Sequence, residues 1–268
     1  MPPVVSFAES RPRNPHNNSE RGKNLMQSWS ITDPGCVRPQ NQDACFIEQL
    51  DENCTLCVVC DGMGGAKSGN VASAMAVEVF AQEIRATWKP GMSQEDVDNM
   101  LRCAVKLVNF AVYDQAAQFV DFSGMGTTLV AALVEGKKAT VVNVGDSRAY
   151  HVSADGIRVV TQDHSVVQFM VERGDLTQEE AKLYPGKNLI TRAIGTDATV
   201  ECDLFHLTLE RADSILLCTD GLSNLLDEQE ILFEVVHGEK LDDCCKRLLD
   251  IALNRGAPDN VTCLLLQV

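Results

Sequence analysis

The sequence contains few basic residues: 23 lysines and arginines stand against 38 aspartates and glutamates, which gives a formal charge of −15. Proteins that bind nucleic acid or anionic membrane surfaces need a basic footprint, and this composition does not supply one. We therefore expect no nucleic-acid partner and no membrane partner. Most of the acidic excess is ordinary surface charge, but clustered aspartates can also bind cations. Their positions are thus more informative than their number.

Long apolar runs are also missing. No stretch reaches the roughly 18 apolar residues of a membrane span, and the N-terminus has no apolar segment of signal-peptide length. These absences predict a cytoplasmic protein. Residues 1–25 are rich in Pro, Asn, Ser and Arg and are predicted to be a flexible leader. Residues 26–268, in a chain that is 45% hydrophobic, are predicted to form one domain.

The eleven cysteines are too sparse for a disulfide scaffold, and their number is odd. Cys54, Cys57 and Cys60 form two overlapping C-x-x-C patterns, which raises the question of a zinc site. Their segment CTLCVVC has the composition of a strand, in which residues three apart face opposite sides. Cys57 would then point away from the other two. We expect small buried residues in a reducing compartment rather than zinc ligands.

Apolar and β-branched runs predict several strands, two of which are separated only by the turn sequence EGKK. Such a hairpin favours antiparallel pairing. The predicted strands are 55–60, 127–134, 139–144, 157–161, 214–218 and 261–267.

Helical periodicity predicts three long helices at 70–87, 94–118 and 241–255. The segment 163–200 is charged and contains several glycines and a proline, which suggests two short helices in an excursion. Together with the strands, these elements predict a single α+β domain.

The stretch VVCDGMGGAKSGN, residues 58–70, permits two interpretations, a phosphate-binding loop or a metal site. The phosphate loop requires G-x-x-x-x-G-K-[ST], and the register that ends at Lys67 and Ser68 fails it. Asp61 and Ala66 occupy the two obligatory glycine positions. An aspartate there would also place negative charge beside the phosphates. The metal interpretation is therefore favoured.

Aspartates recur at the ends of predicted strands. Asp61, Asp146 and Asp220 each follow an apolar run, and Asp259 precedes one. A lone Asp-Gly is usually just a turn, but several at strand ends of one sheet system can share a cleft. Carboxylate oxygens select hard cations such as Mg²⁺ or Mn²⁺.

The charge of this group also fits a metal site. Asp43, Asp61, Asp220 and Asp259 carry four negative charges, which match two divalent cations. Gly62 permits a tight turn that could aim its carbonyl at the same cation as the Asp61 carboxylate.

Two cations of this kind suit phosphate-ester hydrolysis. A metal pair ionises water near neutral pH and stabilises both the attacking and the leaving oxygen of an in-line displacement. A side chain that holds the phosphoryl group would complete such a site. Arg38 lies five residues before Asp43 and could bind phosphate through its bidentate fork. A lone arginine in GCVRPQNQD would otherwise be only a surface charge.

Taken together, the motifs resemble those of the metal-dependent Ser/Thr protein phosphatases of the PPM (type 2C) family. They occur in the family's order and extend over about residues 27–268. The matching segments are RPQNQDA (38–44), VVCDGMGG (58–65), GMGTTLVAAL (124–133), NVGDSRAY (143–150), TQDHS (161–165), LITRAIG (189–195), LLCTDGL (216–222) and APDNVT (257–262).

The resemblance implies a four-layer α-β-β-α sandwich of two antiparallel sheets flanked by helices, with a dimetal cleft at one edge. It implies that Asp61 bridges two Mn²⁺ or Mg²⁺ ions, that the Gly62 carbonyl binds the second, and that Asp220 and Asp259 complete the first. The nucleophile would be a hydroxide that bridges the metals, with no covalent phosphoenzyme.

Further roles follow from the same resemblance. Asp43 would contact metal through water, and Arg38 would hold the substrate phosphate. Asp146, with Asp220, matches a third, weaker metal position. The segment of about 165–200 would be a flap beside the active site. The implied partners are phosphorylated proteins, including a Ser/Thr kinase and its substrates, and we expect a monomer.

The sequence departs from the family pattern at two positions. Met63 replaces a histidine that is proposed as general acid in many eukaryotic members, which resembles the bacterial branch. Gln42 stands where many members have glutamate. His164 could substitute as a proton donor, but a histidine in such a turn is more often structural, and we assign it no catalytic role.

Two other hypotheses belong to different functional classes. A pseudo-phosphatase would use the same fold as a binding module, but it would be expected to lack a ligand aspartate, and none is lost here. A nucleotide-binding switch depends only on the failed phosphate-loop register. Tight Mn²⁺ binding without nucleotide would separate the phosphatase from the switch.

Overall fold

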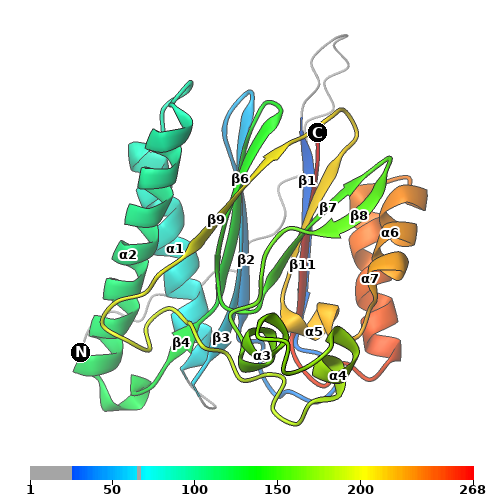
Figure 1. Cartoon of the computed structure of the whole chain (residues 1–268). Helices are drawn as coiled ribbons and strands as arrows, with labels where there is room; N and C mark the ends of the chain where they lie inside the picture. The colour runs from blue at the N-terminus through cyan, green and yellow to red at the C-terminus, as the bar shows by residue number, and fades with distance from the viewer. Residues whose placement is uncertain (1–25, 65–67) are drawn as a thin grey trace.

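Two antiparallel β-sheets lie face to face, and a pair of long helices covers the outer side of each (Figure 1). The computed structural model describes residues 26–64 and 68–268. The predicted leader at 1–25 and Lys67 of the glycine cluster lie outside these residues. The four-layer α-β-β-α sandwich expected from the sequence is confirmed.

One sheet has the strand order β1-β11-β10-β7-β8, so the last strand in the chain pairs with the first. Its strands are β1 (Gln27–Asp33), β7 (Arg148–Ser153), β8 (Gly156–Val159), β10 (Ser214–Cys218) and β11 (Val261–Gln267).

The other sheet has the order β2-β3-β5-β6-β9, and the short strand β4 (Gly126–Thr127) pairs with β3. Its strands are β2 (Asp43–Asp51), β3 (Cys54–Met63), β5 (Leu129–Glu135), β6 (Lys138–Val144) and β9 (Asp203–Thr208). The β5–β6 hairpin confirms the antiparallel pairing predicted across EGKK.

Helices α1 (Gly69–Thr87) and α2 (Gln94–Gln118) cover the β2-to-β9 sheet, and α6 (Glu228–His237) and α7 (Leu241–Asn254) cover the other. Their starts follow from local chemistry. Ser93 accepts a hydrogen bond from the Asp96 amide at the start of α2, and Asp227 with Glu230 forms a capping box on α6. The three long helices predicted from periodicity are confirmed within a residue or so, and α6 was not predicted.

Three apolar clusters correspond to the three interfaces between the layers. One joins α1 and α2 to their sheet, one joins α6 and α7 to theirs, and one lies between the sheets. Cys54 and Cys60 belong to the first and Cys57 to the third, so the predicted alternation of these thiols is confirmed. They are buried apolar residues rather than a shared zinc site.

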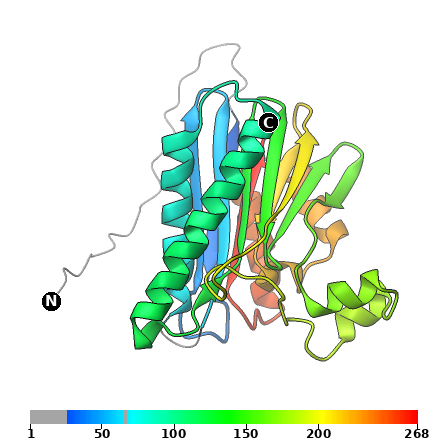
Figure 2. The same cartoon turned by 60° about the vertical axis from the view of Figure 1, so that its left-hand side comes forward.

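The segment between β8 and β9 leaves the layered body and carries two short helices, α3 (Val166–Glu172) and α4 (Gln178–Leu183). Figure 2 shows it projecting from one end of the sandwich. In Figure 1 it lies beside the short helix α5 (Asp220–Ser223), at the edge where several strands end. The remaining short helix, η1 (Val120–Phe122), follows α2.

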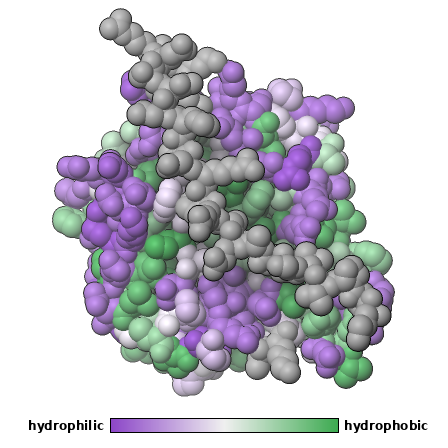
Figure 3. Space-filling model, turned by 180° about the vertical axis from the view of Figure 1, so that it is seen from behind, coloured by the Kyte–Doolittle hydropathy of each residue, from purple (hydrophilic) through white to green (hydrophobic). Residues whose placement is uncertain are grey.

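Among residues 26–64 and 68–268, no helix combines the length and apolarity needed to cross a bilayer. Seen from behind, hydrophilic and hydrophobic residues are interspersed over the surface (Figure 3).

Candidate metal centre

The strand ends at the edge next to α5 enclose a cavity of about 470 Å³. Asp61 lies near the end of β3, Asp220 follows β10, Asp259 precedes β11, and Asp146 follows β6. All four aspartates line this cavity, together with Arg38 and Gly62. Six of the seven residues singled out in the sequence therefore share one cavity, although they come from segments up to 221 residues apart.

Asp43, the seventh, lies behind the cavity wall. It is the first residue of β2 and pairs in register with Asp61 on β3. Its Oδ2 accepts hydrogen bonds from the hydroxyls of Thr219, at 2.9 Å, and Thr262, at 2.6 Å. Its Oδ1 is buried and has no hydrogen-bond partner among the described residues. One carboxylate oxygen is thus fixed, and the other is free to accept a ligand.

The backbone of Asp61 is fixed on both sides. Its N–H donates to Thr128 Oγ1 at 2.9 Å, and its carbonyl accepts from the Thr128 amide and the Thr127 hydroxyl. Gly62 follows at a point of close approach, because a Cβ there would lie 2.1 Å from the carbonyl oxygen of Gly69. Only glycine permits this contact, which orients the Asp61 carboxylate toward the cavity.

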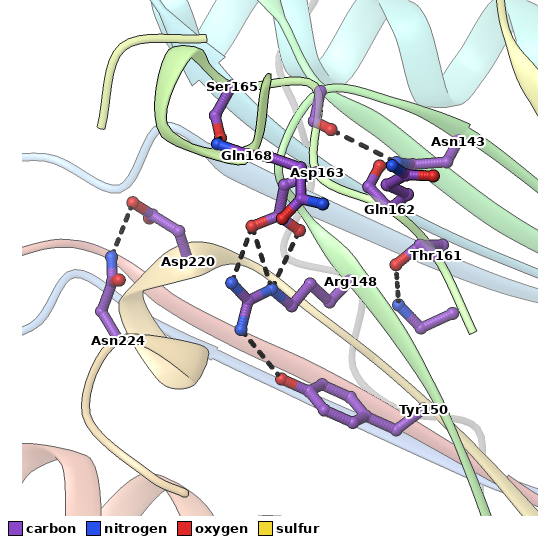
Figure 4. Close-up of polar contacts among 12 residues, drawn as sticks. Asn143, Arg148, Tyr150, Thr161, Gln162, Asp163, Ser165, Gln168, Asp220 and Asn224 are labelled. Carbon is purple, nitrogen blue, oxygen red and sulfur yellow. Dashed lines mark hydrogen bonds and ion pairs between the residues drawn. The ribbon is translucent and has the colours of Figure 1, made fainter. Parts of the chain in front are cut away.

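Asp220 begins α5, and its Oδ2 accepts a hydrogen bond from Asn224 at 3.0 Å (Figure 4). Its other carboxylate oxygen, Oδ1, is buried without a partner among the described residues. The carboxyl groups of Asp61 and Asp220 lie within hydrogen-bonding reach of each other. Gly221 packs against the next strand, since a Cβ there would lie 1.9 Å from the carbonyl oxygen of Asn260.

Asn260 joins Asp259 to the loop that carries Arg38. Its side-chain Nδ2 donates to the carbonyl oxygens of Pro34 and Gln40, and its Oδ1 accepts from the amide of Gln42, at 2.8–3.0 Å. Arg38 itself donates from Nη2 to Asp259 Oδ2 at 2.8 Å, and its side chain is 52% exposed. The arginine thus stands at the mouth of the cavity, where its guanidinium can reach an incoming anion.

Burial raises the pKa of the clustered carboxyl groups, and their mutual repulsion raises it further. The pKa of Asp61 is raised well above its ordinary value by burial and by the charges of Asp43, Asp220, Asp146 and Asp259. The pKa of Asp43 is raised to about 7 by burial, against the lowering effect of its two threonine hydrogen bonds. Burial and the charge of Asp220 raise the pKa of Asp146 to about 7. The site concentrates negative charge that a cation would neutralise.

The donor set fits hard divalent cations. One buried carboxylate oxygen on Asp43 and one on Asp220 find no partner in the part of the chain that the structure describes, and such oxygens are costly unless a ligand satisfies them. Oxygen atoms alone face this cavity from the candidate ligands, which suits Mg²⁺ or Mn²⁺. In the described part of the chain, no three acidic, histidine or cysteine side chains are drawn together into a ready-made ligand cluster. The carboxyl groups of Asp61 and Asp220 lie within hydrogen-bonding reach of each other, and those of Asp146 and Asp259 line the same cavity.

Arg148 provides a fixed positive charge two residues after Asp146. Its guanidinium forms a two-pronged ion pair with Asp163, with Nε–Oδ1 at 2.9 Å and Nη2–Oδ2 at 2.7 Å (Figure 4). It also lies 3.5 Å from the hydroxyl of Tyr150. The charge of Arg148 lowers the pKa of Asp146 and of Asp220, which partly offsets the effect of burial.

The two residues discussed as proton donors occupy different positions. Met63 lines the cavity. His164 is 7% exposed, and the cavity wall formed by the described residues does not include it. Burial lowers its pKa, and both ring nitrogens have protein partners. These contacts agree with its interpretation as a structural histidine.

Sequence reasoning missed the polar residues that hold the aspartates in place. Thr219 and Thr262 bind Asp43, Thr128 binds Asp61, and Asn260 binds the Arg38 loop. All four lie inside motifs already singled out (CTDG, DNVT and GTT). Their adjacency to the aspartates was the available signal, but their partners depend on strand register.

The family model for protein phosphatase 2C matches residues 39–265. Serine/threonine phosphatase stp of Listeria monocytogenes is 34% identical over 242 residues, covering 90% of this chain and 96% of the relative. Serine/threonine protein phosphatase PstP of Mycobacterium tuberculosis is 35% identical over 238 residues, covering 89% of this chain and 44% of the relative.

Solved structures are similar over nearly the same range. Serine/threonine phosphatase Stp1 from Staphylococcus aureus superposes with a TM-score of 0.85 at 38% identity, covering 91% of this chain and 95% of the other. The structure of M. tuberculosis PstP/Ppp gives a TM-score of 0.82 at 33% identity, covering 91% and 99%.

Proposed function

The chain belongs to the protein phosphatase 2C family, and from this premise we propose that it hydrolyses phosphoserine and phosphothreonine in proteins with two Mn²⁺ or Mg²⁺ ions in the cavity. One observation carries the proposal. Carboxylates from separate strands surround a single cavity, and a buried oxygen on each of Asp43 and Asp220 has no partner within residues 26–64 and 68–268. Bound cations would supply the acidity that ionises an attacking water near neutral pH and the charge that balances the phosphoryl oxygens.

Four positions are proposed as direct ligands: the carboxylates of Asp61, Asp220 and Asp259, and the carbonyl of Gly62. Asp43 lies behind the cavity wall, and from there it would orient the ligands and the water bound to the metal. Asp146, together with Asp220, would form a third and weaker position. The hydroxyls of Thr219 and Thr262 support this assignment, because they fix Asp43 in one orientation.

Arg38 is proposed to bind the phosphate of the substrate. Its exposed guanidinium already contacts Asp259 Oδ2 at the cavity mouth, so a phosphoryl group held there would lie between the arginine and the metal ligands. The planar fork of arginine can donate two parallel hydrogen bonds to phosphate. Met63 has no proton to donate, so the leaving group must obtain its proton from another source.

The remaining assignments concern the context of the reaction. We infer that residues 26–268 act as one phosphatase domain and that the segment 165–200 borders the site, since Asn188 and Ile190 line the cavity. The substrates would be phosphorylated proteins, and a Ser/Thr kinase with its targets would be the counterpart. The chain would act as a monomer.

The decisive test compares wild-type protein with Asp61→Asn and Asp220→Asn. Activity is measured with Mn²⁺ on p-nitrophenyl phosphate and on a phosphothreonine peptide, and Mn²⁺ binding is measured by calorimetry without nucleotide. Wild type should bind Mn²⁺ and hydrolyse both substrates, and each variant should lose at least ~10²-fold in rate. Asp155→Asn, in the exposed β7–β8 turn, is the control. Near-normal activity of either cavity variant would refute the proposal.

A further inference from the structure

The turn that carries Asp146 is held along its length by residues 160–164. The Val160 amide donates to the Ala149 carbonyl at 2.7 Å, and the Ala149 amide donates to the Thr161 hydroxyl at 3.0 Å. Asn143 Nδ2 donates to the Gln162 carbonyl at 3.2 Å (Figure 4). Contacts on both sides of Asp146 therefore fasten this turn to one neighbouring segment.

His164 ends that segment and binds both polar groups of Gly145. The His164 amide donates to the Gly145 carbonyl at 2.9 Å, and the Gly145 amide donates to the ring Nδ1 of His164 at 3.1 Å. Gly145 has φ +108°, and a Cβ there would lie 2.6 Å from Thr128 Cγ2. Because Gly145 immediately precedes Asp146, the imidazole fixes the backbone from which that carboxylate projects.

The opposite side of the ring faces the excursion that contains α3 and α4. Nδ1 accepts a hydrogen bond from Gly145, so in the neutral ring Nε2 carries the proton and donates to Asp203 Oδ2 at 3.1 Å. Arg192 Nη1 lies 3.2 Å from the same nitrogen. Asp203 Oδ1 accepts from Arg192 Nη1 at 3.0 Å. Arg192 belongs to the part of this segment that returns from α4 to β9, and Asp203 is the first residue of β9.

The excursion is also attached to the backbone at this point. The carbonyl of His164 accepts from the amide of Thr191 at 2.7 Å. The next residue, Ser165, forms a bridge with Ile190 and caps α3. Both ends of the segment 165–190 thus meet at His164.

We propose that His164 is a positioning residue that joins the Asp146 turn to the base of the 165–190 excursion, so that its two ring nitrogens serve two different parts of the reaction. This inference rests on the proposed function. Through Nδ1 the residue would set the affinity of the Asp146 position for Mn²⁺. Through Nε2 and Asp203 it would hold the excursion that borders the phosphoprotein.

The two ring nitrogens can be tested separately with amide side chains. Asn retains an acceptor near the Nδ1 position and loses the group that reaches Asp203. Gln retains a donor near the Nε2 position and loses the acceptor for Gly145. His164→Gln should therefore affect the metal side, and His164→Asn should affect the excursion.

For His164→Gln we expect weaker Mn²⁺ binding by calorimetry and a roughly three- to ten-fold rise in the Mn²⁺ concentration for half-maximal activity, which corresponds to one lost hydrogen bond. For His164→Asn we expect Mn²⁺ binding close to that of wild type. This variant should instead show a roughly three- to ten-fold higher KM for a phosphothreonine peptide, with little change for p-nitrophenyl phosphate, and faster tryptic cleavage within residues 165–190.

His151 provides a matched control. It is equally buried, at 8% exposure, its Nε2 bonds to Asp213 at 2.9 Å, and its Nδ1 accepts from Arg158. Asp213 immediately precedes β10, whereas Asp220 follows that strand, so this pair lies at the opposite end from the cavity. His151→Gln should lower thermal stability without changing Mn²⁺ binding, peptide KM or cleavage of the excursion.

Two results would overturn the proposal. One is that both His164 variants keep wild-type Mn²⁺ binding, peptide KM and protease resistance. The other is that His164→Gln and His164→Asn both change Mn²⁺ binding, peptide KM and protease resistance to the same extent. That result would mean that the loss of a buried histidine matters and not which ring nitrogen is replaced, and His151→Gln would then change the same three properties. Calorimetry and proteolysis need no turnover, so they test the positioning role even in a protein without activity. Failure of the wild-type protein to hydrolyse phosphopeptides would refute the proposed function and not the positioning role.

Discussion

Asp43 and Asp61 lie directly opposite each other on the antiparallel strands β2 and β3, at the edge of the sheet where the cavity opens. Like charges in such a pair are destabilising, and the folded protein nevertheless holds both in half-buried positions. The arrangement is favourable only when protons or cations neutralise it. This dependence links the stability of the fold to the occupancy of the site.

The metal-free protein should therefore become less stable as pH rises. The pKa of Asp43 and that of Asp146 are about 7 in the folded state, whereas an aspartate in an unfolded chain has a pKa of about 3.9. Between these values the folded state binds more protons, so the free energy of unfolding falls with increasing pH. Thermal melts in EDTA should show a lower Tm at about pH 8 than at about pH 5, and Mn²⁺ should raise Tm more at the higher pH.

Asp43→Asn serves as the control for this experiment, since it removes one of the titrating carboxyl groups. Its Tm in EDTA should depend less steeply on pH than that of wild type. A wild-type Tm in EDTA that rises over the same pH range would contradict the interpretation of the site as a neutralised acid cluster.

Removal of the Thr262 hydroxyl should weaken metal binding. This hydroxyl donates to Asp43 Oδ2 at 2.6 Å, and a residue that orients a ligand group in this way typically affects metal affinity by about 10–100-fold. Thr262→Val should raise the Mn²⁺ concentration for half-maximal activity by roughly ten-fold. Thr140→Val is the control. It removes a hydroxyl on β6 that accepts a hydrogen bond from Gln94 on α2, and it should leave the Mn²⁺ concentration for half-maximal activity unchanged. Equal Mn²⁺ requirements in the two variants would exclude the orienting role.

A methyl group at Gly221 should separate two of the proposed ligands. Its Cβ would lie 1.9 Å from the carbonyl oxygen of Asn260, so the backbone after Asp220 must move away from the backbone after Asp259. We expect Gly221→Ala to lower kcat/KM by at least ~10-fold and to weaken Mn²⁺ binding. Gly136→Ala, where a Cβ meets open space, should cost some stability but no activity. Wild-type metal binding in Gly221→Ala would show that this spacing is not critical.

The Arg148–Asp163 pair should show strong coupling in a double-mutant cycle. Both side chains are largely buried, at 32% and 16% exposure, so removal of one partner leaves a charge without compensation. Arg148→Gln and Asp163→Asn should each destabilise the protein, and the double variant should be destabilised by less than the sum of the two effects, with a coupling energy of about 1–3 kcal/mol in chemical denaturation. A coupling energy near zero would mean that solvent already screens the pair.

Most of the predicted strands lie in central positions, and of the edge strands only β8 was predicted, at 157–161. β3, β5, β6, β10 and β11 have near-continuous buried runs, so their composition identifies them. β1, β2 and β9 are edge strands in which most residues are partly exposed, and their apolar runs are short or interrupted by polar residues. β7 is central but carries Arg148, Tyr150 and His151, which obscure the pattern.

In the candidate site, too, some residues could be predicted from the sequence and others could not. The aspartates and Arg38 were predicted because strand-end carboxylates and the family motifs are visible in the sequence. The contact of Thr219 and Thr262 with Asp43 was not predictable, because it depends on bringing β2 beside residues that lie 176 and 219 positions away. Such contacts follow from the register of strands that pair across the whole chain.

The position of β11 has a consequence for how the protein is made. This strand is the last in the chain, yet it lies between β1 and β10 and is preceded directly by Asp259. During synthesis β1 cannot join its sheet until β11 has been made, since β11 is its only neighbouring strand among the described residues. A nascent chain that is still attached to the ribosome before residue 259 lacks one wall of the cavity. The phosphatase should therefore gain activity only after Asp259 and β11 have been translated.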